Sequence, residues 1–377
     1  MKLLTVLFKK EVLDAGRDKR SVMAGLYYAI GSPILMCVLF SIMLKQFASP
    51  DELKITISNA DVAPSLIQYL DAKEIKHSTD EDVKAITLEI SENYRQKMSE
   101  GRSAQVTIIA DKSDDKLRKS IAQLERSLMQ YNSEIASLRL LSRGIDPTVM
   151  RAVNVQVNDQ ATPESKGGMF LGIATLSIVL TLFYAAMNLA IDTSAGERER
   201  NSLALLLSHP LSSMQIVLAK SGAIATYSML GLALILVVSK FAYAMVPWEQ
   251  LGFSVNLGID FILLCMVIGL PIALMSASLQ VFVSFMAKSF KEAQTYVTMV
   301  LFVPMGLSMV TTYDIGTEVV QWLPIAAQQH AMIEFIKGNP LPVPQLVIST
   351  IVTLALFALF SWLSSRMLKS EKVVFGL

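Results

Sequence analysis

A run of alternating charges, Glu197–Arg200, lies between two long apolar segments of the chain. Ser194 and Glu197 have the spacing of a capping box, in which a hydroxyl and a carboxylate three residues later close the start of a helix. Glu197 and Glu199 would then lie in the first turn, where negative charge suits the helix dipole. Glu197 and Arg200 could pair across one turn. The pattern predicts that a helix begins at this point.

The same helix would carry one apolar face. Leu203, Leu206 and Leu207 recur at the spacing of a helix surface, and Pro210 disfavours helix at the residue before it. A short amphipathic helix of this kind could lie on lipid, but its charges are of both signs, whereas helices on lipid favour Lys and Arg. A merely solvated loop would need neither the cap nor the leucine face. The stretch from Gly196 to Pro210 therefore predicts a helix that docks a protein partner. After it, Ser212 and Gln215 repeat the capping-box spacing at the start of the third span.

The sequence contains no arrangement of residues typical of a catalytic or metal-binding site. The three histidines, His77, His209 and His330, are far apart, and Cys37 and Cys265 both lie inside apolar runs. We therefore expect no catalytic residue, no metal site and no cofactor in this chain. The net charge of +1 gives no reason to expect a nucleic-acid partner. No Gly-x-x-x-x-Gly-Lys-Ser/Thr stretch occurs, so any ATP would be bound by a separate subunit.

The composition is that of a polytopic membrane protein surrounded by lipid. Hydrophobic residues make up 53% of the chain, charged residues 17%, and the mean hydropathy is +0.47. A membrane-spanning helix needs roughly 20 apolar residues, and six segments qualify. Pro271 and Pro304 fall inside two of them and predict kinks. The predicted spans are 21–45, 167–191, 221–246, 258–287, 293–313 and 345–365.

Lysines and arginines predict the orientation of these spans. They are concentrated before the first span, between the second and third, between the fourth and fifth, and after the sixth. Both termini are therefore expected in the cytoplasm, and we expect a multi-pass protein of the bacterial cytoplasmic membrane. Three cytoplasmic segments follow: an amphipathic helix over 1–20, the predicted docking region 192–220 and a tail 366–377. The segments 46–166 and 314–344 would be extracytoplasmic.

The polar insert 46–166 is expected to fold as a small α/β domain after the first span. Residues 53–59, 104–110 and 153–157 alternate like strands, and 62–70 looks helical.

A longer helix is predicted over 114–143. Its apolar positions alternate in steps of four and three, over about three heptads. This stripe could be a coiled-coil seam to another protomer, or it could pack on the sheet of its own domain. The positions are Leu117, Ile121, Leu124, Leu128, Tyr131, Ile135 and Leu138.

Two further expectations concern the spans and the 314–344 segment. A short helix over 325–336 is expected at the membrane surface, since Trp322 favours that zone, with His330 facing water or headgroups. A transport pathway would have to use polar groups in the spans, although small and hydroxyl residues there commonly serve helix packing. The candidates are Asp260, Ser276, Ser278, Gln280 and Thr298.

The charged stretch also resembles a known family. GERERNSLALLLSHPLSSMQIVLAK is similar to the GE-x-ER-G-T-L…LL…P…GK segment of ABC-2 type ABC-transporter permeases. Phe8–Val22 and Lys288–Tyr296 resemble two further charged segments of that family, and the layout with a large insert after the first span resembles its sodium-export (NatB-like) branch. Asn201 and Ala204 depart from the pattern, which usually has Gly and an acidic residue there. The matching positions are Gly196, Glu197, Glu199, Arg200, Ser202, Leu203, Leu206, Leu207, Pro210 and Lys220.

The resemblance implies a permease subunit of an ATP-driven exporter, not itself an enzyme. The 196–208 helix would dock a separate ATPase subunit, with its charges at the contact and its leucines in the partner's cleft. A second permease protomer, identical or not, would complete the assembly. The cargo stays open among sodium ions, drugs, lipids and polysaccharides. A membrane-anchored sensor or scaffold, with an external ligand-binding domain, is the alternative from a different class.

Overall fold

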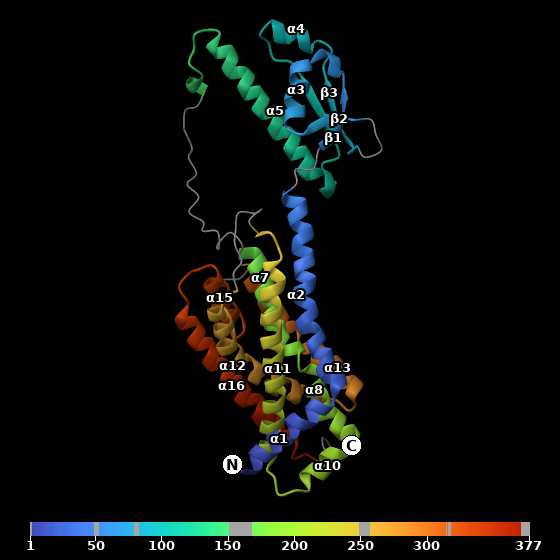
Figure 1. Ribbon diagram of the computed structural model, residues 1–377, viewed down its shortest axis with the longest axis vertical. Helices are drawn as coiled ribbons and strands as arrows, with labels where there is room; N and C mark the ends of the chain where they lie inside the picture. Colours follow the sequence, from blue (N-terminus) through green and yellow to red (C-terminus); the bar gives the residue numbers. More distant parts are fainter. Residues whose placement is uncertain are drawn as a thin grey trace. The chain divides into compact units, whose positions relative to one another are not determined.

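A computed structural model describes residues 2–48, 53–78, 83–150, 168–248, 257–313, 315 and 318–370 (Figure 1). The chain divides into two compact units. One comprises Met1–Leu44 with Gln160–Leu377, and the other comprises Lys45–Asp159. Each unit has its own hydrophobic core of buried residues.

The larger unit is a helical bundle, and its described residues include six helices long and apolar enough to cross a membrane. Their number agrees with the prediction, and the chain is a multi-pass membrane protein. The predicted second span stops at 191, but the helical segment continues to Glu199; the third helix begins at Ser213, well before 221. The six segments are Ser21–Ile42, Gly172–Glu199, Ser213–Ala244, Ile259–Met286, Phe290–Thr312 and Val343–Met367.

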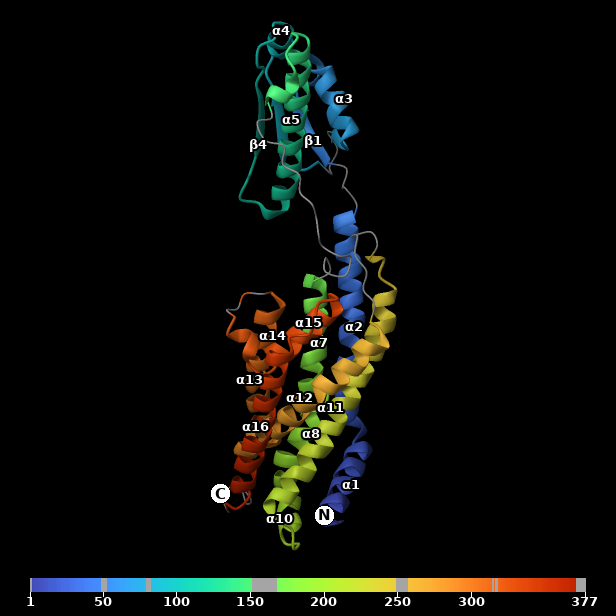
Figure 2. The ribbon, with the colours of Figure 1, turned by 90° about the vertical axis from the view of Figure 1, so that its left-hand side faces the viewer.

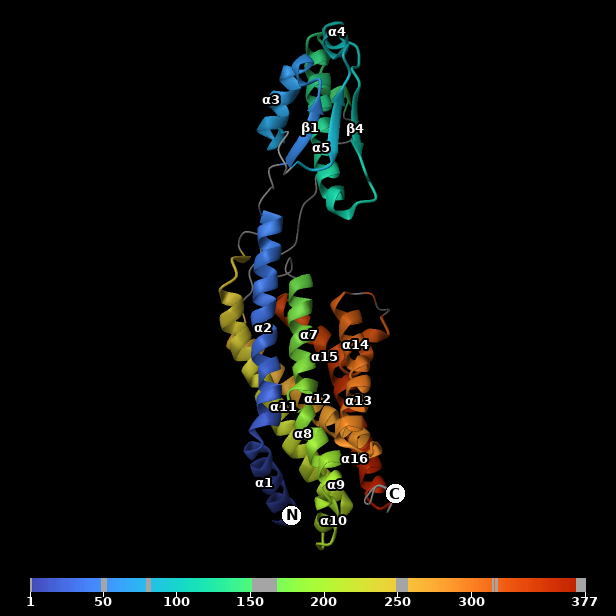
Figure 3. The same ribbon diagram turned by 90° about the vertical axis from the view of Figure 1, so that its right-hand side faces the viewer.

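The helices of this unit have the following bounds. α1 and α2 cover Lys2–Arg17 and Lys19–Ala48. The second span consists of α7, α8, a π-helical turn and α9. Two views from opposite sides show α1, α10 and the last turns of α16 at one end of the bundle, and α15 near the other (Figures 2 and 3). The remaining bounds are α7 Gly168–Tyr184, α8 Met187–Ile191, π turn Asp192–Gly196, α9 Glu197–Glu199, α10 Ser202–Leu207, α11 Ser213–Ala244, α12 Ile259–Met286, α13 Phe290–Val300, α14 Phe302–Thr312, η5 Val320–Trp322, α15 Ala326–Ile336 and α16 Val343–Met367.

Proline affects two of the spans differently. α12 runs through Pro271 as one helix. The fifth span is divided at Leu301 into α13 and α14, three residues before Pro304. Because proline has no N–H, the carbonyl of Val300 lacks its usual helical donor. The predicted irregularity near Pro304 therefore falls one turn earlier in the chain.

The 325–336 helix is packed against other helices of the bundle. α15 contacts α7, α12, α14 and α16, and Gln328 and Gln329 are fully buried on it. Gln328 donates to the Thr353 hydroxyl of α16 over 3.3 Å, and Gln329 donates to Thr312 of α14 over 3.0 Å. The amides of Gln328 and Gln329 thus find hydrogen-bond partners inside the bundle, and the depth of α15 in the membrane stays a prediction. His330, expected to face water or headgroups, is half-buried on the same helix.

The smaller unit contains a four-stranded sheet of order β2-β1-β3-β4. β1, Leu53–Ser58, runs parallel to β2, Ile75–His77, and to β3, Ile86–Ile90; β4, Val106–Ala110, is antiparallel to β3. Alternate residues of β1 and β3 are buried, as expected of strands with one covered face. β2 and β3 are missing from the predicted strands, and the predicted strand 153–157 lies outside the described residues.

The helices of the smaller unit are η1 (Ala60–Val62), α3 (Pro64–Ala72), α4 (Tyr94–Ser99), α5 (Asp115–Leu141) and η2 (Pro147–Met150).

The apolar stripe of α5 divides into two halves. Leu117, Ile121 and Leu124 are buried in the same core as the sheet residues, as packing against the unit's own sheet requires. Further along, Leu138 is 61% exposed. The first half of the stripe therefore belongs to the unit's core, and the second half leaves apolar side chains uncovered by the described residues.

Candidate functional site

A buried lysine organises the end of the bundle where the N-terminal helix lies. The Nζ atom of Lys220, on α11, is 2.7 Å from Oε2 of Glu197 and 3.3 Å from both carboxylate oxygens of Glu11. The Lys220 side chain is 0% exposed and that of Glu11 is 1% exposed. An ion is tolerated at such burial only when it is paired and hydrogen-bonded, and here two carboxylates from different helices surround one ammonium.

Lys10 adds a second cation to this group. Its Nζ atom lies 3.0 Å from Glu11 and 3.9 Å from Glu197, and 3.3 Å from Asp14 one turn further along α1. Burial lowers the pKa of the Lys10 ammonium, but Glu11 and the other carboxylates outweigh this effect and the pKa is raised overall. Lys10 therefore stays charged. We call Lys10, Glu11, Glu197 and Lys220 the charge cluster.

The surrounding contacts hold α1 against α11. The Tyr227 hydroxyl donates to the Val12 carbonyl over 3.1 Å, which anchors one turn of α1. Nearer the start of α1, the ring of Phe8 lies over Gly222, where an added Cβ would be 3.2 Å from the ring carbons. A larger residue at Gly222 would push the two helices apart, so the close approach that buries Glu11 depends on this glycine.

The next two charges connect the second span to the α12–α13 junction. Arg198 is buried and its Nη1 atom donates to the carbonyl of Phe285 in the last turn of α12 over 3.3 Å. The Glu199 carboxylate accepts from the backbone N–H of Phe290, the first residue of α13, over 3.0 Å. Each charge has the sign that the helix terminus it meets prefers: a cation at a C-terminus and an anion at an N-terminus.

The fourth charge pairs within its own segment. Arg200 forms two hydrogen bonds with Asp192, of 3.0 Å and 3.2 Å, and this contact raises the pKa of the guanidinium. An added Cβ at Gly196 would lie 2.9 Å from the same carboxylate. Glycine therefore leaves room for the Asp192–Arg200 pair. The predicted pairing of Arg200 with Glu197 is replaced by this one.

The predicted helix start at Ser194 is wrong. Ser194 lies within the π turn, and its hydroxyl donates back to the Ala190 carbonyl. The backbone stays helical through this turn, so Glu197 and Glu199 occupy the end of the second span and not a first turn. The spacing of a hydroxyl and a carboxylate is the same in a capping box and in a continuing helix, and here the hydroxyl bonds one turn back.

The helical segment ends at Asn201, which adopts a left-handed conformation with φ of 58°. Asparagine and glycine are the residues that take up this conformation most readily. Asn201, at a position where the family usually has Gly, thus adopts a left-handed conformation that glycine also adopts readily. α10 follows, and Pro210 lies exposed after it. The capping box predicted for Ser212 and Gln215 is present at the start of α11.

The leucines of α10 do not share one free face. Leu203 is fully buried in the core of the bundle, so the prediction that it inserts into a partner does not fit this structure. Leu206 and Leu207 are half-buried against that core. Leu205, which the predicted face omitted, is 67% exposed. The exposed apolar surface of α10 is therefore centred on Leu205.

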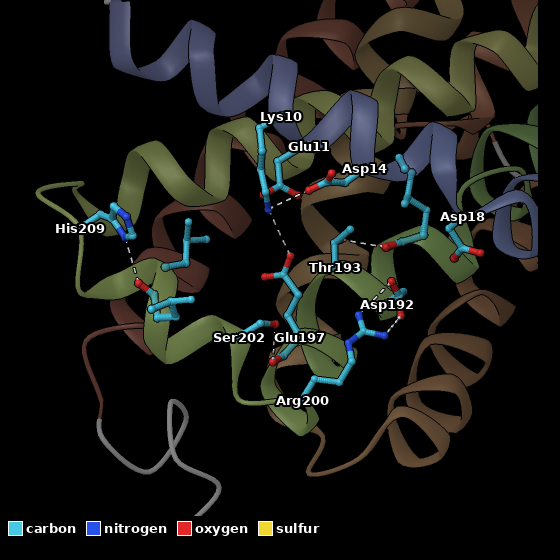
Figure 4. Close-up of a pocket in the computed structure, with 14 residues that line it drawn as sticks. Lys10, Glu11, Asp14, Asp18, Asp192, Thr193, Glu197, Arg200, Ser202 and His209 are labelled. Carbon is cyan, nitrogen blue, oxygen red and sulfur yellow. Dashed lines mark hydrogen bonds and ion pairs between the residues drawn. The ribbon is translucent and has the colours of Figure 1, made fainter.

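A cavity of about 350 Å³ opens between α1, the end of the second span and α10 (Figure 4). Its walls combine Lys10, Glu11 and Glu197 of the charge cluster with the Asp192–Arg200 pair and the exposed part of α10. The labelled side chains in Figure 4 converge from these three elements. The residues that line it are Lys10, Glu11, Asp14, Ala15, Asp18, Leu189, Asp192, Thr193, Glu197, Arg200, Ser202, Leu205, Leu206 and His209.

The candidate pathway residues of α12 have structural partners in the second span. The Ser276 hydroxyl donates to the Leu182 carbonyl over 3.2 Å, and the Gln280 amide donates to the Phe183 carbonyl over 2.8 Å. These carbonyls precede the turn between α7 and α8, where the helix no longer supplies donors. Ser276 and Gln280 therefore stabilise the irregularity of the second span.

The other candidate pathway residues lie apart from this contact. The buried Ser278 hydroxyl donates to the Met275 carbonyl of its own helix over 2.9 Å. Asp260 is exposed in the first turn of α12, and the exposed Thr298 donates to the Gln294 carbonyl of α13. The structure therefore does not bring the five predicted pathway residues together.

Sequence reasoning missed the roles of Glu11 and Arg198. One signal was available: Lys220 falls inside a continuous helix of otherwise apolar character, and a charge at that depth requires a counter-ion. The counter-ion could not be chosen from spacing, since Glu11 lies 209 residues away. Arg198 gave no local signal, because its acceptor is a backbone carbonyl of another helix.

Comparison with known proteins identifies the class. Residues 24–366 match the family described as ABC-2 family transporter protein. The chain is also 24% identical over 316 residues to the ABC transporter permease protein NatB of Bacillus subtilis (strain 168), covering 80% of this chain and 81% of that protein. No solved structure matches significantly. The chain belongs to the ABC-2 transporter family and is a permease subunit, a class in which ATPase activity lies in a separate subunit.

The charge cluster yields a stability prediction. Replacing Lys220 by Met leaves Glu11 and Glu197 buried without their shared cation, and removing one partner of a buried ion pair costs about 3–5 kcal/mol. We expect Lys220→Met to lower the free energy of unfolding of the detergent-solubilised full chain by that amount. The measurement is a denaturant titration that follows tryptophan fluorescence.

The control is a second substitution within the same cluster. Glu11→Gln removes one of the two carboxylates that lose Lys220, so the double variant should recover part of the lost stability. If Lys220→Met and Glu11→Gln destabilise additively, the two side chains do not interact and the cluster is not the stabilising feature described here.

Proposed function

We propose that this chain is the membrane permease of an ATP-driven exporter and that it receives the ATPase subunit at α10 and the adjoining cavity. The observation that carries the proposal is the set of contacts made by the charged stretch. Glu197 pairs with α11 and α1, Arg198 with the end of α12, Glu199 with the start of α13, and Arg200 with Asp192.

These contacts assign the two parts of the stretch different roles. The four charges are engaged within the chain, so they transmit a displacement and do not contribute the main contact to the partner. The exposed part of α10 and the cavity supply the contact itself. In the predicted set, Gly196 to Arg200 thus belong to transmission, while Leu206, Leu207 and Pro210 border the docking surface around Leu205.

The proposed mechanism follows from this division. Closure of two ATPase subunits on ATP pushes α10, and the push reaches the second span directly because only Arg200 and Asn201 separate α9 from α10. Arg198 and Glu199 carry it to the α12–α13 junction, and Glu197 carries it to α11. The helices then shift together, and a pathway between two permease protomers opens outward.

The orientation belongs to the same proposal. The lysines and arginines of the chain favour a cytoplasmic position for α1, α10 and the end of α16. The end of the bundle that carries the cavity would then face the ATPase. The Lys45–Asp159 unit would be extracytoplasmic, and the membrane would be a bacterial cytoplasmic membrane.

Docking at α10 is tested by Leu205→Arg. An arginine at the centre of an apolar contact adds a charge that the interface must desolvate, which costs several kcal/mol. We expect the variant to insert into the membrane normally and to lose at least about tenfold of the ATPase subunit retained on affinity purification. The matched control is Leu138→Arg, a similarly exposed leucine in the other unit. Retention equal to that of the control would remove α10 as the docking element.

Transmission is tested by Glu199→Ala. This substitution removes the acceptor at the start of α13 and leaves the surface of α10 intact. We expect the ATPase subunit to be retained as in the unchanged protein, while ATP-driven transport in proteoliposomes falls roughly tenfold. Glu318→Ala, an exposed glutamate in the segment before η5, serves as the control. Normal transport by Glu199→Ala would show that the α12–α13 contact carries no displacement.

Sodium is the cargo that we propose to examine first, on the strength of the sequence resemblance to the sodium-export branch. We expect ATP-dependent accumulation of radioactive sodium in inside-out vesicles that contain the permease and its ATPase. The Leu205→Arg variant should abolish this accumulation. ATP hydrolysis without sodium movement would exclude sodium and direct the search to drugs, lipids and polysaccharides, while leaving the docking proposal in place.

A further inference from the structure

The Lys45–Asp159 unit contains a cavity of its own, of about 490 Å³. It follows the second half of α5, with α4, the loop after α4 and the start of β4 on the other side. This volume is within the range of roughly 300–1,000 Å³ that is typical of small-molecule sites. The cavity is therefore large enough to hold an organic ligand.

Positive charge is concentrated at one end of this cavity. Arg139, in the last turn of α5, and Arg143, in the turn that follows the helix, both line it, and none of its described lining residues is an aspartate or glutamate. Arg139 donates through Nη2 to the Met98 sulfur over 3.1 Å and to the Arg102 carbonyl over 3.2 Å, both neutral acceptors. Neither arginine forms an ion pair with any described residue. The cavity thus offers two guanidinium groups without a counter-ion.

The loop opposite brings its backbone close to these groups. Gly101 has a φ of +72°, and a Cβ built there would lie 3.5 Å from Nη2 of Arg143. Because the left-handed backbone and the small residue occur together, Arg143 lies beside main chain and not behind a bulky side chain. Its guanidinium remains exposed, and it is geometrically suited to bind an acid group through two parallel hydrogen bonds.

The other end of the cavity is apolar and phenolic. Leu128 and Ile135 of α5 contribute apolar surface, and the hydroxyls of Tyr94 and Tyr131 lie 3.4 Å apart. Burial, together with Tyr131, raises the pKa of the Tyr94 phenol, so this hydroxyl is neutral. From Leu128 to Leu140 the wall follows α5 for about three helical turns, or ~18 Å. The cavity is therefore polarised along its length, from apolar to cationic.

We propose that this cavity binds a diffusible organic acid with an apolar body, whose carboxylate is held by Arg139 and Arg143 and whose body lies against Leu128 and Ile135. The two guanidinium groups form no ion pair with the described residues and therefore favour an anionic ligand. The length of the apolar wall favours a ligand with an extended apolar part. The site lies entirely within one unit of the chain. Its occupation is therefore independent of ATPase docking at α10, and either proposal can fail without the other.

Binding is tested on the full chain in phosphatidylcholine nanodiscs by equilibrium dialysis with radiolabelled 6-phenylhexanoate, and empty nanodiscs give the background. We expect saturable binding of one molecule per chain. The neutral 6-phenylhexanamide, which has the same body without the charge, should bind at least about tenfold more weakly, the loss expected of one charge-assisted hydrogen bond. Equal binding of acid and amide, or the absence of saturable binding, would overturn the proposal.

Substitutions of arginines in α5 and in the turn after it test whether the acid binds in this cavity. Arg143→Gln should weaken binding of the acid roughly tenfold and leave binding of the amide unchanged. Arg143→Lys, which keeps the charge but not the paired donors, should give an intermediate affinity. Arg126→Gln removes an exposed arginine of the same helix outside the cavity and should have no effect. Equal weakening by Arg126→Gln and Arg143→Gln would show that general surface charge, and not this cavity, attracts the probe.

Discussion

One ammonium group determines how this end of the bundle is arranged. Lys220 is fully buried, and its charge is stable there only because Glu11 and Glu197 approach it from two other helices. Glu197 in turn lies at the start of α9, so the position of the second span is fixed relative to α1 and α11. The contacts of Arg198 and Glu199 with α12 and α13 extend the same arrangement to the fourth and fifth spans. The cavity beside α10 exists because these elements meet at this point.

The four charges of the stretch have partners within the chain, whereas the surface around Leu205 is exposed. This difference explains the functional proposal. A charged stretch on the surface of a membrane protein suggests contact with a partner, yet the four charges of Glu197–Arg200 are engaged by groups within the chain. What remains for a partner is the exposed surface around Leu205 and the cavity behind it. A contact at α10 can therefore be specific without removing any of the internal ion pairs. The family to which the chain belongs makes an ATPase subunit the natural partner for that surface.

The sequence was informative where a structural feature depends on neighbouring residues. Six apolar runs predicted six candidate spans, and the Ser212–Gln215 pattern predicted a capping box that the structure contains. It failed where a local pattern has two solutions, as at Ser194, whose hydroxyl bonds backwards in a continuing helix. It failed also where the partner is remote: the hydrogen bonds of Gln328 to Thr353 and of Gln329 to Thr312, inside the bundle, have no local signal in the sequence. The partners of Lys220 and Arg198 belong to the same class of long-range contact.

The contact between Glu11 and Lys220 also constrains the order in which the protein can be assembled. The two residues are separated by 209 positions, with two spans and the whole Lys45–Asp159 unit between them. During synthesis the first helix therefore emerges long before its counter-ion exists, and Glu11 must stay hydrated until α11 has been inserted. Closure of this ion pair is consequently a late event in biogenesis. A chain interrupted before Lys220 retains an undocked N-terminal helix whose Glu11 lacks its partner on α11, which distinguishes an incomplete permease from a finished one.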